Sequence, residues 1–346
     1  SAESCTLDCG ESGSTLRFML PVACALGAGA SFSMRARLPQ RPLSPLYGEL
    51  TAHGCALSPQ GSAPLTVSGS LTGGEYRIAG NVSSQFITGL LLALPLLVEN
   101  SRINVTGKLE SRPYVDLTLR ALRDFGIEIE ERCGSFLIRG GQQFSSPGKL
   151  TVEGDWSNAA PWLALGAVSE QPVTITGLDT NSPQGDKAFI HILRRFGAAV
   201  CRDASGITVC GGHLKGIDVG VRDIPDLVPM IAVVALAAEG RTRILNAARL
   251  RLKESDRLSA IANTLGALGA QIIETPDSLL IEGGRKLRGG SIDSQNDHRI
   301  AMMAAVASVL CDGEVAIAQA GSVNKSYPRF FDDLRSLGGG TAEEQP

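Results

Sequence analysis

The sequence lacks the features that mark a metalloprotein, a secreted protein or a membrane protein. Its eight cysteines form no C-x-x-C pair, and none of its four histidines stands at a metal-ligand spacing from them, so no metal site is expected. Cysteines of this kind are typical of a reducing compartment. The longest apolar run, residues 86–98, is too short to span a bilayer and contains Pro95. The first residues show neither a basic nor an apolar region, so we expect no signal peptide and a cytoplasmic location.

The chain also lacks a strong net charge. Lys and Arg together number 32 and Asp and Glu 35, which gives −3 at pH 7. No global field therefore favours nucleic acid or an anionic membrane, and any anion site has to be built locally. What the sequence does have is apolar content. Of its 346 residues 43% are hydrophobic and 19% charged, which suits two globular domains with sizeable cores.

A helix that ends in a bulky residue followed by glycine recurs five times, at intervals of about 71 residues. In the first four copies a two-stranded pattern follows the glycine. Glycine at such a point is predicted to adopt the left-handed conformation that ends a helix. The five glycines are Gly54, Gly126, Gly197, Gly269 and Gly338.

A second feature has the same period. A polar turn rich in Gly, Ser and Asp opens a nearly all-apolar helix, and such turns begin at Gly10, Gly80, Gly154, Arg222 and Asn296. A helix that is apolar on all sides is expected in the interior of a domain. Its N-terminus carries the positive end of the helix dipole, so five such helix starts predict an anion-binding centre.

Each unit of about 71 residues carries two helices and several strands, which predicts an α/β fold rather than a thin solenoid. We expect two domains of repeated β/α units with buried central helices, residues 1–182 and residues 183–346, joined near a hinge at residues 180–186. The first unit is expected to be incomplete at its N-terminal side. Residues 5–9 leave no room for a strand–helix pair before the first polar turn.

The densest charge cluster spans residues 249–258, between a strand-like segment and a helical pattern. Lys253, Glu254 and Arg257 on such a connection suit an anionic ligand with an acid or base group beside it. The alternative is a solvated helix start, with Lys253 and Arg257 four residues apart. The local pattern alone leaves both interpretations open.

Other polar groups stand at the starts of the apolar helices. Asp226 and Arg299 lie at two of these helix starts, and residues 83–85 place two hydroxyls and an amide at a third, where they could cradle a phosphate. The ordinary alternative for each is a helix cap or a first-turn acid. Arg41 lies in a loop between two prolines, and Lys325 lies in a turn before the last helix, where a bare surface lysine is the alternative.

In this order, the motifs resemble the 5-enolpyruvylshikimate-3-phosphate synthase family of enolpyruvyl transferases, from about residue 10 to residue 337. The matching segments are residues 13–17, 40–43, 83–86, 111–114, 224–226, 253–257, 296–299 and 324–328. The resemblance implies two domains of three repeated units each, an arrangement known as an inside-out α/β barrel, of which five units are recognisable here. It implies a transfer of the enolpyruvyl group from phosphoenolpyruvate to the 5-hydroxyl of shikimate 3-phosphate, with release of phosphate. It also implies a monomer with no metal, organic cofactor, nucleic acid or membrane partner.

The resemblance assigns the residues to the two substrates. For shikimate 3-phosphate it implies Ser83, Ser84, Gln85, Ser111, Tyr114, Asp226 and Lys253. For phosphoenolpyruvate it implies Gly13, Arg41, Gln85, Arg257, Arg299 and Lys325. Asp226 is the expected base facing shikimate, and Glu254 and Lys325 share the remaining catalytic work in a division that stays open. Gly13 stands where the family admits glycine or alanine, a position that bears on the inhibitor glyphosate.

One departure leaves alternatives open. The family's early lysine-serine…arginine motif is absent, and Arg35 and Arg37 come too late in the order to replace it. A non-catalytic remnant that binds phosphorylated ligands is therefore one alternative. The other is the sister enzyme that uses UDP-N-acetylglucosamine. Its hallmark cysteine before the loop arginine is missing from residues 34–40, which counts against it.

Overall fold

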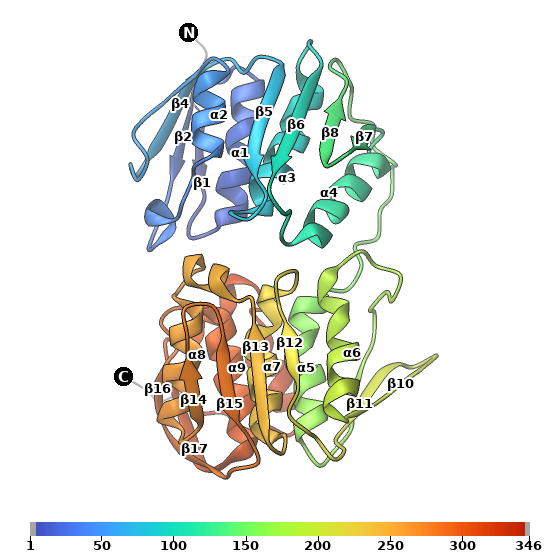
Figure 1. Ribbon diagram of the computed structural model, residues 1–346, viewed down its shortest axis with the longest axis vertical. Coiled ribbons are helices and arrows are strands. Elements are labelled where there is room, and N and C mark those ends of the chain that lie inside the picture. Colours follow the sequence, from blue (N-terminus) through green and yellow to red (C-terminus); the bar gives the residue numbers. More distant parts are fainter. Residues whose placement is uncertain (1–4, 343–346) are drawn as a thin grey trace. The chain divides into compact units, whose positions relative to one another are not determined.

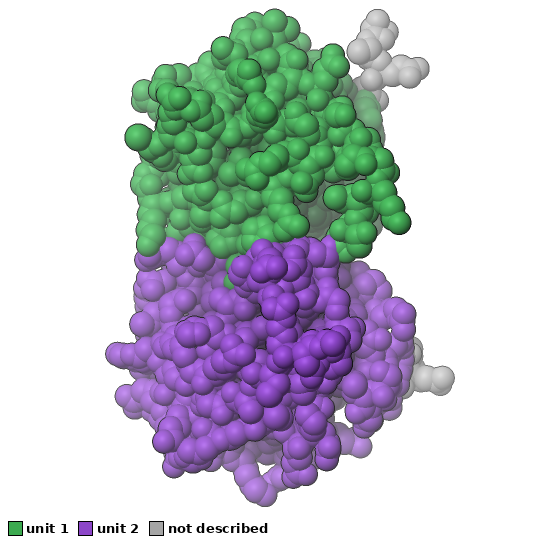
Figure 2. Space-filling model, turned by 90° about the vertical axis from the view of Figure 1, so that its right-hand side faces the viewer, with its two compact units in different colours: residues 1–152, 183–185 green, residues 153–182, 186–346 purple. Residues whose placement is uncertain are grey.

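The structure, a computed structural model, describes residues 5–342. The chain forms two compact units (Figures 1 and 2). The first contains the residues up to Val152 together with Pro183–Gly185. The second contains Glu153–Ser182 and the residues from Asp186 onward.

Both units are built from one repeat: a strand, an inner helix, a second strand, an outer helix and a two-stranded hairpin. The first unit holds two copies with all of these elements. The first copy consists of β1 (Cys5–Asp8), α1 (Gly13–Ala25), β2 (Ala30–Ser33), α2 (Leu46–Ala52), β3 (Cys55–Leu57) and β4 (Leu65–Gly69). The second copy consists of β5 (Gly74–Ala79), α3 (Ser84–Ala93), β6 (Ser101–Thr106), α4 (Arg112–Asp124), β7 (Ile129–Arg132) and β8 (Ser135–Ile138).

The second unit holds three further copies, of which the middle one has every element. The third copy contains α5 (Trp156–Val168), β9 (Val173–Ile175), α6 (Phe189–Phe196), β10 (Ala199–Asp203) and β11 (Gly206–Cys210). The fourth contains β12 (Asp218–Gly220), α7 (Val228–Ala237), β13 (Arg241–Leu245), α8 (Arg257–Ala267), β14 (Gln271–Glu274) and β15 (Leu279–Glu282). The fifth contains β16 (Leu287–Asp293), α9 (His298–Ala307), β17 (Cys311–Ala318) and α10 (Phe330–Ser336).

The complete copies share one sheet topology. Their strand orders are β1-β2-β4-β3, β5-β6-β8-β7 and β12-β13-β15-β14. In each, the first two strands are parallel and the hairpin is antiparallel. Parallel strands need a helical crossover, which the inner helix supplies. Because their carboxyl ends meet at one edge of the sheet, the loops that follow both strands lie at that same edge.

The inner helices are buried, as the sequence predicts. Every residue of α7 from Val228 to Leu236 is buried, and α5 and α9 are buried almost throughout. The apolar run at residues 86–98 becomes α3 and one 3₁₀ turn, Leu94–Leu96. The outer helices bury only one face; α4, for example, buries Val115 and Leu122. Each unit therefore has a core of its own around its inner helices.

The five repeat glycines follow the ends of outer helices and all have left-handed backbones. Their φ angles are +98° at Gly54, +80° at Gly126, +108° at Gly197, +95° at Gly269 and +93° at Gly338. A side chain in this conformation would be strained, so glycine is required there. The helix ends predicted from the repeat are confirmed.

Residues 5–8 form strand β1, and no helix or hairpin precedes that strand among residues 5–342, in line with the expectation that no strand–helix pair fits before the first polar turn. The structure differs from the sequence-based expectation in the grouping of residues 153–182. The predicted boundary at 182/183 differs from the compact units, since α5 packs against α7 and β11 of the second unit.

The five sheets of residues 5–342 stay separate, so the barrel-like arrangement implied by the resemblance is one of sheets around inner helices, with no closed sheet. No helix among the described residues has both the length and the apolar character needed to cross a membrane. All eight cysteines carry free thiols.

Candidate active site

The polar groups of the second unit lie on loops that precede three inner or outer helices. Asp226 lies on a 3₁₀ turn, Pro225–Leu227, immediately before α7. Lys253 and Glu254 lie between a second 3₁₀ turn, Ala248–Leu252, and Arg257, the first residue of α8. The strands before these two connections, β12 and β13, are parallel neighbours. The fold therefore brings the two connections to one sheet edge.

The carboxylate of Asp226 faces three cations. Its Oδ1 lies 3.1 Å from Lys253 Nζ and 2.8 Å from Arg257 Nη1, and its Oδ2 lies 3.7 Å from Arg299 Nη2. Burial alone would raise the pKa of this carboxyl, but the three positive charges outweigh it and hold the pKa well below the usual range. Asp226 is therefore an ionised carboxylate that faces three cations, rather than a simple first-turn acid.

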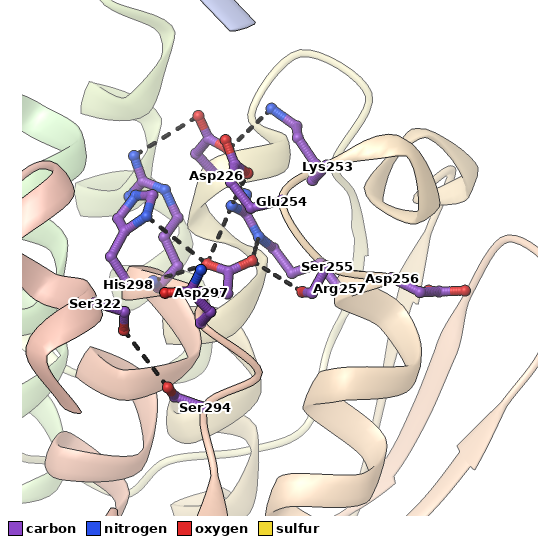
Figure 3. A network of polar contacts seen from close by, with 12 residues as sticks. Asp226, Lys253, Glu254, Ser255, Asp256, Arg257, Ser294, Asp297, His298 and Ser322 are labelled. Atoms are coloured by element: carbon purple, nitrogen blue, oxygen red, sulfur yellow. Dashed lines mark hydrogen bonds and ion pairs between the residues drawn. The ribbon is translucent and has the colours of Figure 1, made fainter. Parts of the chain in front are cut away.

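The guanidinium of Arg257 is 1% exposed and contacts three carboxylates. Besides Asp226, it reaches Glu254 Oε2 from Nη2 at 2.6 Å and Asp297 Oδ2 from Nε at 2.9 Å. Burial lowers the pKa of such a group, yet the charges of Asp297, Glu254 and Asp226 raise it overall. The alternative of a solvated helix start is thus wrong for this residue. Figure 3 shows these charged side chains turned toward one another.

Arg299 and Lys325 border the same cluster. Arg299 lies in the first turn of α9, and its backbone N–H donates to Asp297 Oδ1 at 2.9 Å. Lys325 ends a 3₁₀ turn, Ala320–Lys325, and its Nζ donates to the carbonyl of Asn296 at 2.5 Å. All the second-unit residues predicted for substrate binding or catalysis therefore lie on loops or in first helical turns that these contacts connect. They are Asp226, Lys253, Glu254, Arg257, Arg299 and Lys325.

In the first unit the predicted phosphate-binding residues lie at the starts of α3 and α4. Ser83 caps α3, with its hydroxyl accepting from Gln85 N–H, and Ser84 is the first residue of that helix. Ser111 precedes α4 and Tyr114 lies in its first turn. The preceding strands β5 and β6 are parallel neighbours, so both helix starts lie at one sheet edge. Two helix N-termini at one edge suit an anion.

The predicted phosphoenolpyruvate residues of the first unit gather around Arg17. Its Nη1 donates to Gln85 Oε1 and its Nη2 to the carbonyl of Pro42, each at 2.8 Å. The guanidinium of Arg41 packs directly on Gly13, where an added Cβ would lie 2.8 Å from Nη1. Arg17 is 5% exposed and lies 5.2 Å from the Phe86 ring centre. It thus links the starts of α1 and α3 to the Arg41 loop.

Sequence reasoning missed Arg17, Ser255 and Asp297 as members of the candidate site. All three lie within matching segments, residues 13–17, 253–257 and 296–299. In the structure Asp297 caps α9, and the same carboxylate also contacts Arg257 and Ser255. The sequence signal for this pair was an aspartate and an arginine, Asp297 and Arg257, that stand in two separate motifs at the starts of helical patterns.

His298 predicts a dependence of stability on pH. Burial, followed by the charges of Arg299 and Arg257, lowers the pKa of this imidazole to about 4, although Asp297 attracts the charged form. In the unfolded chain the pKa of histidine is near 6.5. Below that pH the unfolded chain binds a proton that the folded chain does not, so the free energy of unfolding decreases as the pH falls. Stability is expected to fall by up to about 3 kcal/mol as pH drops from about 6.5 to about 4.

The measurement is urea unfolding of the unchanged chain and of His298→Gln at several pH values between 7.5 and 4. We expect the unchanged chain to lose more stability than the variant over this interval, because glutamine does not titrate. Parallel curves for the two proteins would contradict the assignment.

Comparisons with known proteins identify the family of the chain. The family model for EPSP synthase (3-phosphoshikimate 1-carboxyvinyltransferase) matches residues 1–334. The chain belongs to the EPSP synthase family. The 3-phosphoshikimate 1-carboxyvinyltransferase of Clostridium kluyveri is 44% identical over 96% of this chain and 78% of its own length. That of Clostridium acetobutylicum is 44% identical over 99% of this chain and 80% of its own length.

The fold agrees with a solved member of the family. The structure of EPSP synthase from Acinetobacter baumannii matches with a TM-score of 0.80 and 27% identity, over 99% of this chain and 80% of that protein. The chain thus spans about four-fifths of the length of these relatives. Membership of the family confirms the resemblance drawn from the ordered motifs.

Proposed function

We propose that this chain transfers the enolpyruvyl group of phosphoenolpyruvate to the 5-hydroxyl of shikimate 3-phosphate and releases inorganic phosphate. The observation that carries the proposal is the second-unit cluster, in which Lys253, Arg257 and Arg299 surround the carboxylate of Asp226. Both substrates are anions, and this cluster combines cations that bind them with carboxylates that move protons. The family match and the names of the relatives support the same reaction.

In the proposed mechanism the addition needs two proton transfers, one from the 5-hydroxyl of shikimate 3-phosphate and one to the methylene of phosphoenolpyruvate. Asp226 takes the proton of the 5-hydroxyl as that oxygen bonds to C2 of phosphoenolpyruvate, while Glu254 or Lys325 protonates the methylene at C3. The C–O bond to phosphate then breaks, a methyl proton returns to the protein, and the double bond of the product forms. Arg257, Arg299 and Lys325 stabilise the charge on the departing phosphate.

A carboxylate with a strongly depressed pKa is a weak base, so substrate binding has to change its surroundings. An anionic substrate that pairs with Lys253, Arg257 and Arg299 offsets the positive charge that these residues place on Asp226. The pKa of Asp226 then rises toward its usual range. Binding of the anions thereby prepares the base that the reaction needs.

The first unit supplies the rest of the binding groups in this proposal. Ser83, Ser84, Ser111 and the nearby Tyr114 bind the phosphate and ring of shikimate 3-phosphate from the starts of α3 and α4. Gly13, Arg41 and Gln85, gathered around Arg17, bind phosphoenolpyruvate. The proposed enzyme acts as a cytoplasmic monomer without metal or organic cofactor, on small-molecule substrates alone.

The test is phosphate release by the purified chain from phosphoenolpyruvate, with shikimate 3-phosphate or UDP-N-acetylglucosamine as acceptor. We expect release with shikimate 3-phosphate only. Release only with the nucleotide sugar would identify the sister activity. Binding of shikimate 3-phosphate without any release would identify a non-catalytic member of the family.

Replacing Arg299 with lysine is expected to raise KM for phosphoenolpyruvate about tenfold and to leave KM for shikimate 3-phosphate nearly unchanged. Lysine keeps the charge but loses the planar fork that binds an anion through two N–H groups. Steady-state kinetics with each substrate varied in turn measures this difference. Arg251→Lys is the matched control, since Arg251 pairs with Asp256 and Glu274 instead. An unaltered KM for phosphoenolpyruvate in Arg299→Lys would refute its role.

A further inference from the structure

The carboxylate of Asp297 is central to the second-unit cluster, and none of the roles proposed above uses it. Its side chain is 0% exposed. Oδ2 accepts from Arg257 Nε and from the Ser255 hydroxyl, each at 2.9 Å. Oδ1 accepts from Arg299 N–H at 2.9 Å and from Arg257 Nη2 at 3.3 Å. One buried anion therefore holds a side chain of α8 and the first turn of α9 (Figure 3).

The guanidinium of Arg257 has two edges with different partners. The edge formed by Nε and Nη2 faces Asp297 alone, in a two-point contact. The edge formed by Nη1 and Nη2 faces Asp226 and Glu254, at 2.8 and 2.6 Å. The first edge is fully buried with its partner, while the side chains of Asp226 and Glu254 are 17% and 21% exposed. An incoming anion can therefore compete only for the second edge.

We infer that Asp297 is a positioning residue for phosphoenolpyruvate: it fixes Arg257 by the Nε edge while the substrate takes over the Nη1–Nη2 edge from Asp226 and Glu254. This inference rests on the proposed function and adds a residue to it. No covalent step is involved.

Two physical arguments support this role over that of a simple helix cap. A cap requires one acceptor oxygen, and Oδ1 already provides it, whereas Oδ2 is bound by Arg257 and Ser255. In addition, a buried guanidinium that changes partners needs one anion that stays in place, because an unpaired buried charge is strongly destabilising. Asp297 is the carboxylate that stays bound to Arg257 when the Nη1–Nη2 edge exchanges Asp226 and Glu254 for the substrate. It also depends on Arg257, whose charge and hydrogen bonds overcome the effect of burial and hold the pKa of Asp297 well below its usual range.

The test is Asp297→Asn, which keeps an acceptor for the cap of α9 and removes the charge that faces Arg257. We expect KM for phosphoenolpyruvate to rise about 10–100-fold, as for the loss of hydrogen bonds between charged groups. KM for shikimate 3-phosphate should stay within about threefold, because Lys253 pairs with Asp226, whereas the hydrogen bonds of Asp297 go to Ser255, Arg257 and Arg299. A residue with only a structural role would change both constants together or neither.

Asp256→Asn is the matched control. Asp256 caps α8 and holds Arg251 at 2.8 Å, as Asp297 caps α9 and holds Arg257, but it points away from the cluster (Figure 3). We expect both KM values of this variant to match those of the unchanged chain. The same rise in Asp256→Asn as in Asp297→Asn, or equal rises in the two KM values of Asp297→Asn, would overturn the inference.

A second variant covers the case in which Asp297→Asn does not fold. Ser255→Ala removes one neutral donor from Oδ2 and leaves the ion pair, so KM for phosphoenolpyruvate should rise about 2–10-fold. Calorimetric titration of phosphoenolpyruvate in the presence of shikimate 3-phosphate separates the two proposals. If the unchanged chain binds phosphoenolpyruvate without turnover, the proposed reaction fails, and the weaker binding by Ser255→Ala still supports the inference. If the unchanged chain turns over and both variants keep its KM, only the inference fails. No binding by the unchanged chain overturns both.

Discussion

Replacing Asp226 with asparagine is expected to lower kcat about 10²–10⁴-fold, the usual loss when a positioned acid or base is removed. Asparagine is chosen rather than alanine because Lys253, Arg257 and Arg299 all face this side chain. An alanine would leave three cations around an empty space, and the loss of activity could then be a loss of fold. The amide keeps the shape and one acceptor oxygen, but its NH2 group only donates and the side chain cannot take the proton of the 5-hydroxyl.

Phosphate release at saturating substrates measures kcat, and circular dichroism with thermal unfolding checks the fold. Asp223→Asn is the matched control: Asp223 lies three residues earlier on the same connection between β12 and α7, and it is exposed. We expect its kcat to stay within about twofold of the unchanged chain. A folded Asp226→Asn protein with unchanged kcat would rule out Asp226 as the base.

Replacing Arg257 with methionine is expected to destabilise the second unit by about 3–5 kcal/mol. The guanidinium is 1% exposed and pairs with Asp297, which is 0% exposed, as well as with Asp226 and Glu254. Methionine fills a similar volume but leaves the buried Asp297 carboxylate without its cation. For a unit of this size, the loss corresponds to a fall in Tm of roughly 10 °C or more.

Thermal and urea unfolding measure this effect, with Arg251→Met as the control. Arg251 also pairs with two carboxylates, at 2.8 and 2.7 Å, but its side chain is 29% exposed. Because the half-buried Arg251 and its partners stay in contact with water, and such ion pairs contribute little, Arg251→Met should cost about 1 kcal/mol or less. The double variant Arg257→Met with Asp297→Asn should recover part of the lost stability, since it removes the unpaired charge. Equal losses for the two arginines would contradict the buried role of Arg257.

The repeat and its buried helices follow from local physics, which is why the sequence predicts them well. A helix that is apolar on every side has to be interior, as α7 is. A glycine after an amphipathic helix adopts the left-handed backbone that ends the helix without steric strain, as Gly126 does. Both rules need only neighbouring residues. The strand at which each repeat unit begins cannot be predicted from neighbouring residues, because the pairing of β1 with β2 joins residues some 25 positions apart.

In the candidate site, too, the features that depend on neighbouring residues can be predicted from the sequence, and the contacts between distant residues cannot. Lys253, Glu254 and Arg257 are close in sequence, and their types alone suggest an anion site with an acid or base group beside it. Whether they form a solvated helix start or a buried cluster depends on Asp226 and Asp297, which are 27 and 40 or more residues away. The same holds for Arg17, whose partner Gln85 is 68 residues away. No local pattern specifies these pairs.

The sequence by itself determined the α/β class, the repeat, the interior helices and, through the ordered motifs, the family. Only the tertiary structure decided which carboxylate each cation contacts and that Asp297 holds Arg257 from the buried side. The physical reason is that helix type and burial are set by a residue's own neighbours along the chain. An ion pair depends instead on two segments that come together only when the sheets and inner helices have packed, and its strength depends on the burial that this packing creates.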